Sequence, residues 1–490
     1  MNRLGDVYRP SLARATDLYQ LTMAQGYWTS GTAGREAVFH LYFRANPFGG
    51  GFAVACGIVR ALEFLEDYGF SPEDLEYLET LVGNDGRPLF DPAFLRQLGS
   101  LRLSCDVDAV PEGTVVFPYE PLLRVKGPIL QAQIVETALL TLVNFETLIA
   151  TKAARVVLAA KGDPVIDFGL RRAQGLDGGL SASRAAYVGG CAATSNVLAG
   201  RLLGLPVRGT HAHSWVMAFA SELEAFDAYA RAQPNNCTFL VDTYDTLEGV
   251  RHAIAAGRRL RERGHEMVGI RLDSGDLAYL SIQARRLLDE GGFPAARIVA
   301  SNDLDEQTIA SLKEQGARID VWGVGTRLVT GGEQAALGGV YKLGAVRDAS
   351  GAWRHTVKLS EQAAKTSNPG VQQVRRFSSP DGFAADMIFD ESGGATPESV
   401  IVDPLDPTRR KRVPAGTPYE DLLRPLMRAG RAVAPHPPLE EARERVHQQL
   451  DRLHSGIKRF VHPHQYPVGL SRELHDLKTR LVLEQRGESA

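Results

Sequence analysis

The sequence has few cysteines, no long apolar run and no excess of charge of one sign, and each absence excludes a class of protein. Its four cysteines (Cys56, Cys105, Cys191 and Cys237) lie far apart and form no C-x-x-C pair. This spacing gives no sign of a disulfide framework and indicates buried thiols in a reducing compartment. The formal net charge of −3 gives no reason to expect a nucleic acid or an anionic membrane surface as a partner.

The apolar segments argue against secretion and against a membrane span. The N-terminus leads into no apolar stretch, so a secretory signal is not expected. The most apolar helical candidate covers residues 128–160, but it is interrupted by Glu136, Glu146, Lys152 and Arg155. It is therefore predicted to be a core helix or a helix pair, and the protein is expected to be cytoplasmic.

Hydrophobic patterning divides the chain into three expected domains. Residues 1–130 mix strand-like and helical segments, such as the β-forming stretch Glu36–Phe43, without a regular βα repeat. They predict an α+β or sandwich-like N-terminal domain. Residues 131–345 are expected to form an α/β domain. Residues 346–490 carry a polar loop at 365–370 and end in charged helices.

In residues 131–345, short apolar runs alternate with longer helical patterns. The helical patterns include Thr246–Glu262 and Leu277–Glu290. The apolar runs are marked by Val165, Val207, Phe239, Val268, Ile298 and Val321. This alternation is typical of βα units in a parallel sheet or barrel. The lack of an early Gly-x-Gly-x-x-Gly after a first strand favours the barrel over an open doubly wound sheet.

Polar residues follow nearly every predicted strand in this region, so a barrel would gather them at its C-terminal rim. The most informative stretch is Gly209–Ser214, where two histidines stand between a predicted strand and an apolar helical run. Backbone N–H groups at such a junction favour anions, and imidazole gains or loses charge near neutral pH. No third ligand stands at a recognisable spacing from His211 and His213, so a zinc site is not expected.

Two further strand ends carry groups suited to a phosphorylated sugar. Alternation along the strand puts Arg271 and Asp273 on one face, where Asp273 could hydrogen-bond ribose hydroxyls and Arg271 could bind an anion bidentately. The segment Gly323–Thr326 exposes successive N–H groups and a hydroxyl to a phosphate, although glycines after strands also form plain turns.

The segment after the first strand of this region adds an aromatic ring, Phe168, and two guanidinium groups, Arg171 and Arg172. Phe168 fits a core position equally well, whereas the arginines are hard to bury without an anion. Together the rim residues fit a phosphorylated sugar as substrate. The basic run Arg409–Arg412 stands apart from them and is predicted to be a solvated turn.

Several motifs, in order along roughly residues 16 to 376, resemble those of the nicotinate phosphoribosyltransferase family. They are Thr16-Asp17-Leu18-Tyr19-Gln20-Leu21-Thr22-Met23-Ala24, Phe168-Gly169-x-Arg171-Arg172-Ala173-Gln174-Gly175, Gly209-Thr210-x-Ala212-His213-Ser214, Gly269-Ile270-Arg271-Leu272-Asp273-Ser274-Gly275-Asp276-Leu277, Gly323-Val324-Gly325-Thr326, Tyr341-Lys342-Leu343 and Lys365-Thr366-x-x-Pro369-Gly370.

The resemblance implies a type II phosphoribosyltransferase fold: an irregular (β/α) barrel as catalytic domain, an α+β N-terminal domain and a C-terminal extension with an active-site loop. It implies an enzyme of NAD biosynthesis that joins nicotinate to 5-phosphoribosyl 1-pyrophosphate, giving nicotinate mononucleotide and pyrophosphate. Mg²⁺ accompanies the phosphates, and ATP is hydrolysed through a transient phosphohistidine, a coupling classed with the ligases. By motif position this histidine is His213, whereas His211 occupies a variable position and is expected to be a supporting or incidental residue.

The resemblance also assigns the other site residues. Tyr19 and Phe168 would sandwich the pyridine ring, with Tyr19 supplied by a neighbouring subunit, so a homodimer with shared active sites is expected. Asp273 would hold the ribose, and Gln372 stands where many relatives carry lysine. The residues expected near the nicotinate carboxylate or the phosphates are Arg171, Thr210, Ser214 and Arg271, and those expected at the 5′-phosphate are Gly323, Gly325 and Thr326.

Two other functions stay open at this point. A nicotinamide phosphoribosyltransferase would share the barrel and the histidine, but nicotinate needs a cation near its carboxylate, and the arginine-rich surroundings favour nicotinate. A non-catalytic protein on a degenerate barrel is less compatible with the presence of His213, Arg271 and Asp273.

Overall fold

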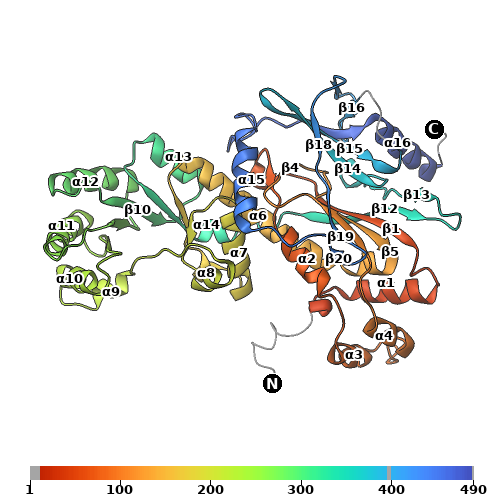
Figure 1. Cartoon of the computed structure of the whole chain (residues 1–490), viewed down its shortest axis with the longest axis horizontal. Helices are drawn as coiled ribbons and strands as arrows, with labels where there is room; N and C mark the ends of the chain where they lie inside the picture. The colour runs from red at the N-terminus through yellow and green to blue at the C-terminus, as the bar shows by residue number, and fades with distance from the viewer. Residues whose placement is uncertain (1–11, 394–398, 488–490) are drawn as a thin grey trace. The chain divides into compact units, whose positions relative to one another are not determined.

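The structure is a computed structural model that describes residues 12–393 and 399–487 (Figure 1). The chain divides into two compact units. The first unit combines the residues up to 147 with those from 336 onward, and the second unit covers residues 148–335. Within the described ranges, no helix combines the length and the apolar character that crossing a membrane requires.

The first unit contains a seven-stranded antiparallel sheet whose strands come from both ends of the chain. In spatial order the strands are β13 (Trp353–His355), β12 (Gly339–Arg347), β1 (Glu36–Phe43), β5 (Leu123–Pro128), β3 (Asp106–Ala109), β19 (Arg424–Arg428) and β20 (Arg431–Ala432). β19 pairs with β3, with Arg424 opposite Ala109. Residues before 130 and after 346, which sequence patterns treat as separate regions, therefore share one sheet.

The helices of this unit follow local sequence signals. α3 begins after Ser71, whose hydroxyl accepts a hydrogen bond from the Asp74 amide, and has Pro72 in its first turn. The apolar segment 128–160 is a helix pair, as predicted, and its second helix continues into the second unit. The helices are α1 (Leu18–Thr29), α2 (Ile58–Glu66), α3 (Pro72–Glu79), α4 (Pro92–Gly99), α5 (Ile129–Ile134), α6 (Glu136–Ala160), α15 (Leu439–Asp451) and α16 (Arg472–Arg486).

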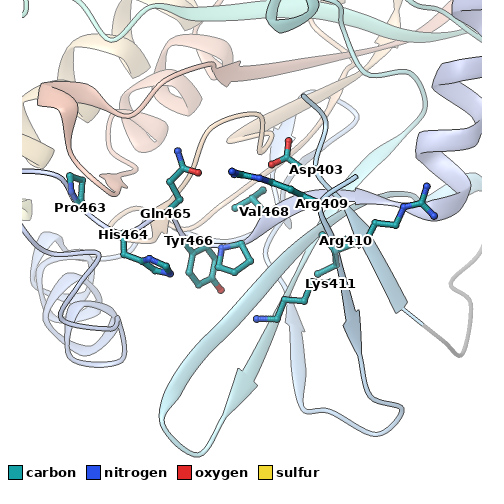
Figure 2. Close-up of a pocket in the computed structure, with 11 residues that line it drawn as sticks. Asp403, Arg409, Arg410, Lys411, Pro463, His464, Gln465, Tyr466 and Val468 are labelled. Carbon is teal, nitrogen blue, oxygen red and sulfur yellow. The ribbon is translucent and has the colours of Figure 1, made fainter. Parts of the chain in front are cut away.

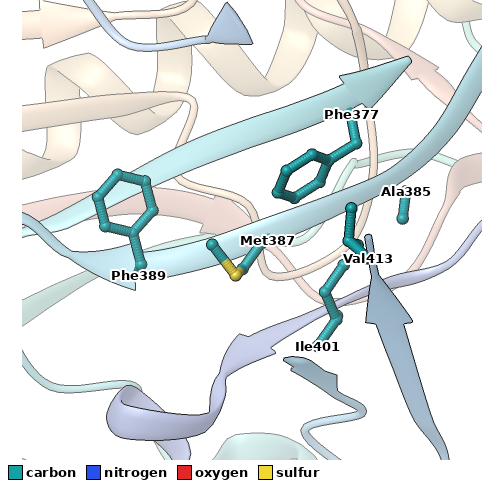
Figure 3. Packing of buried hydrophobic residues seen from close by; sticks show 6 residues of the cluster. All are labelled: Phe377, Ala385, Met387, Phe389, Ile401 and Val413. Atoms are coloured by element: carbon teal, nitrogen blue, oxygen red, sulfur yellow. The ribbon is translucent and has the colours of Figure 1, made fainter. Parts of the chain in front are cut away.

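A second sheet in this unit encloses its own small core. In spatial order its strands are β17 (Arg410–Val413), β16 (Ser399–Val402), β21 (Val468–Ser471), β15 (Gly382–Asp390), β14 (Gln372–Ser379) and β18 (Tyr419–Asp421). Side chains alternate between the faces of a strand, so Ala385, Met387 and Phe389 share one face of β15. They cluster with Phe377 and with residues of β16 and β17 (Figure 3). A two-stranded sheet, β2 (Ala53–Val54) with β4 (Val115–Val116), lies apart from these ladders.

The second unit is built on a six-stranded parallel sheet. In spatial order its strands are β7 (Ala193–Thr194), β6 (Val165–Asp167), β11 (Val321–Val324), β10 (Arg297–Asn302), β9 (Gly269–Leu272) and β8 (Thr238–Leu240). Its helices are α7 (Leu176–Val188), α8 (Val197–Leu203), α9 (His213–Met217), α10 (Glu222–Ala232), α11 (Thr246–Glu262), α12 (Leu277–Glu290), α13 (Glu306–Glu314) and α14 (Thr326–Val329).

The predicted alternation of strands and helices in residues 131–345 is confirmed, with one exception. α11 and α12 span the predicted ranges and begin after Asp245 and Asp276, whose side chains accept backbone N–H bonds of the first turn. Val207 was expected in a strand, but it makes only an isolated parallel bridge to Thr194 of β7. The chain is thus a mixed α/β protein. Among the described residues, no strand ladder joins the sheet's end strands β7 and β8.

A buried ion pair links two strands of the second sheet in the first unit. The guanidinium of Arg376 on β14 donates to both carboxylate oxygens of Asp386 on β15, at 3.0 Å from Nε to Oδ1 and 2.5 Å from the terminal nitrogen to Oδ2. The Tyr466 hydroxyl also donates to Asp386, at 2.9 Å. Both charged side chains are fully shielded from solvent, so each depends on the other to offset the cost of its burial.

We therefore expect Arg376→Met to lower the free energy of unfolding by about 3–5 kcal/mol, because it leaves the Asp386 carboxylate buried without its cation. Urea denaturation followed by circular dichroism measures this change. Arg412→Met, on an exposed residue of β17, is the matched control and should change stability little. Equal effects of the two substitutions would contradict the prediction.

Candidate active site

The loops that follow the parallel strands of the second unit form the candidate site. The carboxyl ends of parallel strands lie along one edge of a sheet, so the polar residues after β6, β8, β9, β10 and β11 share that edge. The segment Gly209–Ser214 joins them through hydrogen bonds to β8 and β9. The order of the parallel strands thus explains why the predicted rim residues lie along one edge.

His213 stands at the beginning of α9 with both ring nitrogens near polar groups. Its Nδ1 lies 3.1 Å from the Thr243 hydroxyl, and its Nε2 lies 3.6 Å from Asp273 Oδ2. The side chain remains 38% exposed. The imidazole is thus oriented from two sides and still open to a ligand, which is the combination that a nucleophilic or proton-transferring histidine requires.

Asp273 is held by three neighbouring strand ends. Its carboxylate accepts a hydrogen bond from the Ser301 hydroxyl near the end of β10 and lies 3.7 Å from the Arg271 guanidinium. Its backbone N–H donates to Asp242 Oδ2 at 2.7 Å, and the same oxygen accepts from the Ser274 hydroxyl at 2.7 Å. These contacts fix the Asp273 carboxylate beside His213.

Asp242, Thr243 and Ser301 belong to the site; they were expected among the polar residues of the rim, but no role was assigned to them. Asp242 Oδ1 is buried and has no hydrogen-bond partner in the described ranges. A carboxylate directly after the apolar run 239–241 was the available signal, but one acidic residue after a strand is also typical of a turn. Only the hydrogen bond from the backbone of Asp273, 31 residues later, distinguishes a site residue from a turn residue at this position.

Arg271 carries a largely buried positive charge. Its side chain is 12% exposed, and one terminal nitrogen donates to Thr210 Oγ1 at 2.5 Å and to the His211 carbonyl at 3.2 Å. Burial lowers the pKa of the Arg271 guanidinium, while the carboxylates of Asp273 and Asp242 oppose that shift. Its Nε is buried without a hydrogen-bond partner among the residues that the structure describes.

The two histidines of the hexapeptide Gly209–Ser214 lie in different environments. His211 is 9% exposed, and its ring centroid lies 4.7 Å from that of Tyr229. Its Nε2 accepts the backbone N–H of Leu240 on β8 at 3.2 Å, so Nδ1 carries the proton and faces the Ala212 carbonyl at 3.4 Å. Burial is the main cause that lowers the pKa of His211 to about 4.

Phe168 is positioned by the residues around it. Asp167 is buried, and its carboxylate accepts hydrogen bonds from the Gly169 amide, the Ser183 hydroxyl and the Thr194 hydroxyl, each at 2.8 Å. This fixes the turn that carries the half-buried Phe168 ring. A Cβ on Gly323 would lie 2.6 Å from two ring carbons, so glycine is required there for the ring to lie against β11.

The other predicted site residues are spread more widely over the structure than His213, Asp273 and Arg271. Arg171 and Ser214 are exposed. Thr326 begins α14, and Gly325, the residue before it, lies close to the Phe168 carbonyl. Tyr19 lies on α1 in the first unit and is 48% exposed. It borders a cavity of about 440 Å³ whose other walls include Lys342, Lys358 and Ser367.

Gln372, the departure from the family pattern, is an interior residue. It is 1% exposed, its side-chain amide donates to the Asn368 carbonyl at 2.8 Å, and its backbone N–H donates to His40 Nε2 at 3.1 Å. Burial strongly lowers the pKa of His40, so this ring is a neutral acceptor. The position supports the loop 365–370 from within and offers no exposed basic contact.

Three residues of the basic run Arg409–Arg412 border a separate cavity of about 710 Å³ in the first unit (Figure 2). These three cations already have protein partners: Arg409 pairs with Asp406 at 3.4 Å, Arg410 Nε donates to the Pro407 carbonyl, and Lys411 donates to the Ala384 carbonyl. The predicted solvated turn is confirmed as to exposure, but Arg410–Val413 forms strand β17. We assign no ligand to this cavity.

A parallel sheet with a histidine, carboxylates and a buried arginine at its carboxyl edge defines an α/β protein equipped to bind a phosphorylated ligand. Family descriptions match three consecutive parts of the chain: the nicotinate phosphoribosyltransferase N-terminal domain at residues 15–144, the nicotinate phosphoribosyltransferase family at 164–373, and the nicotinate phosphoribosyltransferase C-terminal domain at 371–478. The chain belongs to the nicotinate phosphoribosyltransferase family.

Individual relatives are similar over nearly the whole chain. A nicotinate phosphoribosyltransferase of Bacillus subtilis is 40% identical over 491 residues, which cover 98% of each chain. One of Dictyostelium discoideum is 39% identical, covering 96% of this chain and 88% of the relative. The crystal structure of human nicotinic acid phosphoribosyltransferase has a TM-score of 0.83 at 34% identity, covering 95% of this chain and 99% of that one.

From the lowered pKa of His211 we predict how the free energy of unfolding depends on pH. The unfolded chain binds a proton at the ordinary histidine pKa near 6.5, whereas the folded chain does so only near pH 4. The stability that neutral His211 contributes is therefore present above pH 6.5 and is lost as the pH falls to 4, by up to about 3 kcal/mol.

The measurement is the free energy of unfolding between pH 4 and pH 8 for the wild type and for His211→Gln. Glutamine keeps an acceptor for the Leu240 amide but does not titrate. We expect the variant to lose less stability on acidification than the wild type. Parallel pH profiles for the two proteins would contradict the assigned state of His211.

Proposed function

We propose that this chain joins nicotinate to 5-phosphoribosyl 1-pyrophosphate, giving nicotinate mononucleotide and pyrophosphate in NAD biosynthesis. The observation that carries the proposal is the joint placement of Arg271, Asp273 and His213 at one sheet edge, in a chain of this family. The four cysteines are all buried, which is compatible with a reducing, cytoplasmic setting.

The geometry fits the charges that develop in this reaction. When the bond from C1 of the ribose to pyrophosphate breaks, C1 becomes positive and the leaving group takes the electron pair. Arg271, whose side chain is 12% exposed, places a positive charge at this edge that can stabilise an anion. The pyridine nitrogen then bonds to C1, a step that requires positioning more than covalent help from the protein. Asp273 is placed to hydrogen-bond ribose hydroxyls.

Magnesium is expected with the pyrophosphate, and the residues present fit it. Mg²⁺ prefers oxygen ligands and often binds through one or two carboxylates together with substrate phosphates. Asp242, with one buried and unpartnered oxygen, and Asp273 supply carboxylates beside the Ser274 hydroxyl. When bound, the ion supplies positive charge to the leaving pyrophosphate.

Coupling to ATP through His213 is the second part of the proposal. A ring nitrogen of His213 would form a bond to the γ-phosphorus of ATP while the bond from that phosphorus to ADP breaks. The 38% exposure of the side chain and its contacts with Thr243 and Asp273 support this role. A phosphorylated His213 adds negative charge next to the pyrophosphate site and can thereby bias loop order and substrate affinity.

The pyridine ring is assigned to Phe168 on its own subunit and to Tyr19 of a second copy of the chain, which makes the proposed enzyme a homodimer with shared sites. The exposure of Tyr19 and its cavity support a role toward a partner. The remaining assignments are Arg171, Thr210, Ser214 and Arg271 to the carboxylate or the phosphates, and Gly323, Gly325 and Thr326 to the 5′-phosphate.

The fold that we propose for the second unit is the irregular (β/α) barrel of type II phosphoribosyltransferases. The segment 207–211 supports closure of the sheet. At its start Val207 bridges Thr194 of β7, and at its end His211 accepts the Leu240 amide of β8. One short segment thus contacts both end strands of the sheet.

Replacing His213 tests the ATP coupling. We expect His213→Ala to reduce product formation in the presence of ATP to the rate seen without ATP, because no side chain remains to carry the phosphate. Incubation with γ-labelled ATP, followed by mapping of the labelled residue, is the measurement. His211→Gln is the matched control and should retain the label. Label that persists in His213→Ala would refute the assignment.

Comparing nicotinate with nicotinamide as substrates tests which pyridine the enzyme uses. A carboxylate gains charge-assisted hydrogen bonds at a cationic site, so kcat/KM for nicotinate should exceed that for nicotinamide by at least about tenfold. Turnover of each pyridine with 5-phosphoribosyl 1-pyrophosphate measures this ratio. A preference for nicotinamide would favour the alternative enzyme, and no turnover of either would favour a non-catalytic protein.

A further inference from the structure

The cavity beside Tyr19 has a wall made of two segments that are tied together. Lys358 and Ser367 both line the cavity. The Lys358 amide donates to the Ser367 hydroxyl at 2.9 Å, and the Ser367 amide donates to the Lys358 carbonyl at 3.3 Å. Ser367 is 1% exposed. The position of Ser367 therefore fixes the backbone from which the Lys358 side chain extends.

The inner side of the same loop rests on a residue from the end of the chain. Asn368 is buried, and its side-chain oxygen accepts a hydrogen bond from Lys478 Nζ on α16 at 2.9 Å. Its carbonyl accepts from the Gln372 side chain. α16 itself packs against β15, β16 and β21, so Lys478 connects the loop to the second sheet.

Lys478 is an unusual residue to find in this position. Its side chain is half-buried, and this burial lowers its pKa to about 8. Among the described residues it takes part in no ion pair within 4.0 Å. What the ammonium adds is a directed hydrogen bond to Asn368.

We propose that Lys478 is a positioning residue: through Asn368 it holds the loop 358–370 in the conformation that places Lys358 and Ser367 in the wall of the Tyr19 cavity. This inference rests on the proposed function, which makes that cavity part of a substrate site. The wall holds two cations, Lys342 and Lys358, and one carboxylate, Glu136, so its net positive charge favours the substrate that carries phosphate groups.

We expect Lys478→Met to raise KM for 5-phosphoribosyl 1-pyrophosphate about tenfold, the size expected for a lost hydrogen bond to a charged group, with kcat changed less than about twofold. Arg480→Met, on an exposed residue of the same helix, is the control and should leave KM unchanged. Asn368→Ala removes the acceptor while keeping the lysine, and should raise KM similarly even if Lys478→Met folds poorly.

The double variant Lys478→Met/Asn368→Ala decides whether the two residues act together. If they do, its KM should be no higher than that of the worse single variant, because both substitutions remove the same contact. Additive effects, or an unchanged KM in the single variants, would overturn the inference.

Hydrogen exchange supplies a readout that does not need activity. Lys478→Met should speed amide exchange in residues 358–370, and Arg480→Met should not. Unchanged exchange in this loop would overturn the proposed clamp. Faster loop exchange without any nicotinate turnover by the wild type would instead refute the proposed function and leave the clamp between Lys478 and the loop supported.

Discussion

The buried guanidinium of Arg271 is the constraint on which the arrangement of the candidate site depends. β9 presents it with a side chain that is 12% exposed, and burial disfavours its charge. The charge is kept by acceptors from separate segments: the Thr210 hydroxyl, the His211 carbonyl and the Asp273 carboxylate. These contacts tie the hexapeptide to β9. They also leave the buried Nε–H of Arg271 without an acceptor among the described residues.

The parts of the fold that sequence predicted are those governed by local signals. β1 coincides with a stretch of β-forming residues, and α11 and α12 begin at aspartates that cap them. The gathering of rim residues was also predictable, because parallel strands align their carboxyl ends whatever the details of the helices. Asp242 was expected at the rim but was given no role, since its role depends on a hydrogen bond from the Asp273 backbone, which no local pattern encodes.

Non-local pairing explains the remaining differences. β19 joins β3 across more than 300 residues of chain, and only the completed sheet shows that the two regions belong together. Val207 resembled a strand residue because it is apolar and β-branched, but Pro206 before it has no N–H for a ladder. The segment therefore makes one bridge to Thr194 and then leaves the sheet, which brings His211 and His213 to different surroundings.

Because the segment after Val207 leaves the sheet, His211 and His213 lie in different surroundings. At the end strand β8, the Leu240 amide needs an acceptor, and the His211 imidazole supplies it in place of a backbone carbonyl. Because the His211 ring accepts the Leu240 N–H, the His211 carbonyl is not needed for that strand and accepts a hydrogen bond from Arg271. The buried ring thus stabilises the sheet edge while its own backbone holds the cation of the site. Two residues later α9 begins, and His213 faces Thr243 and Asp273 with part of its ring open to solvent. The neutral, buried histidine is therefore what allows the exposed one to be held next to a charged pocket.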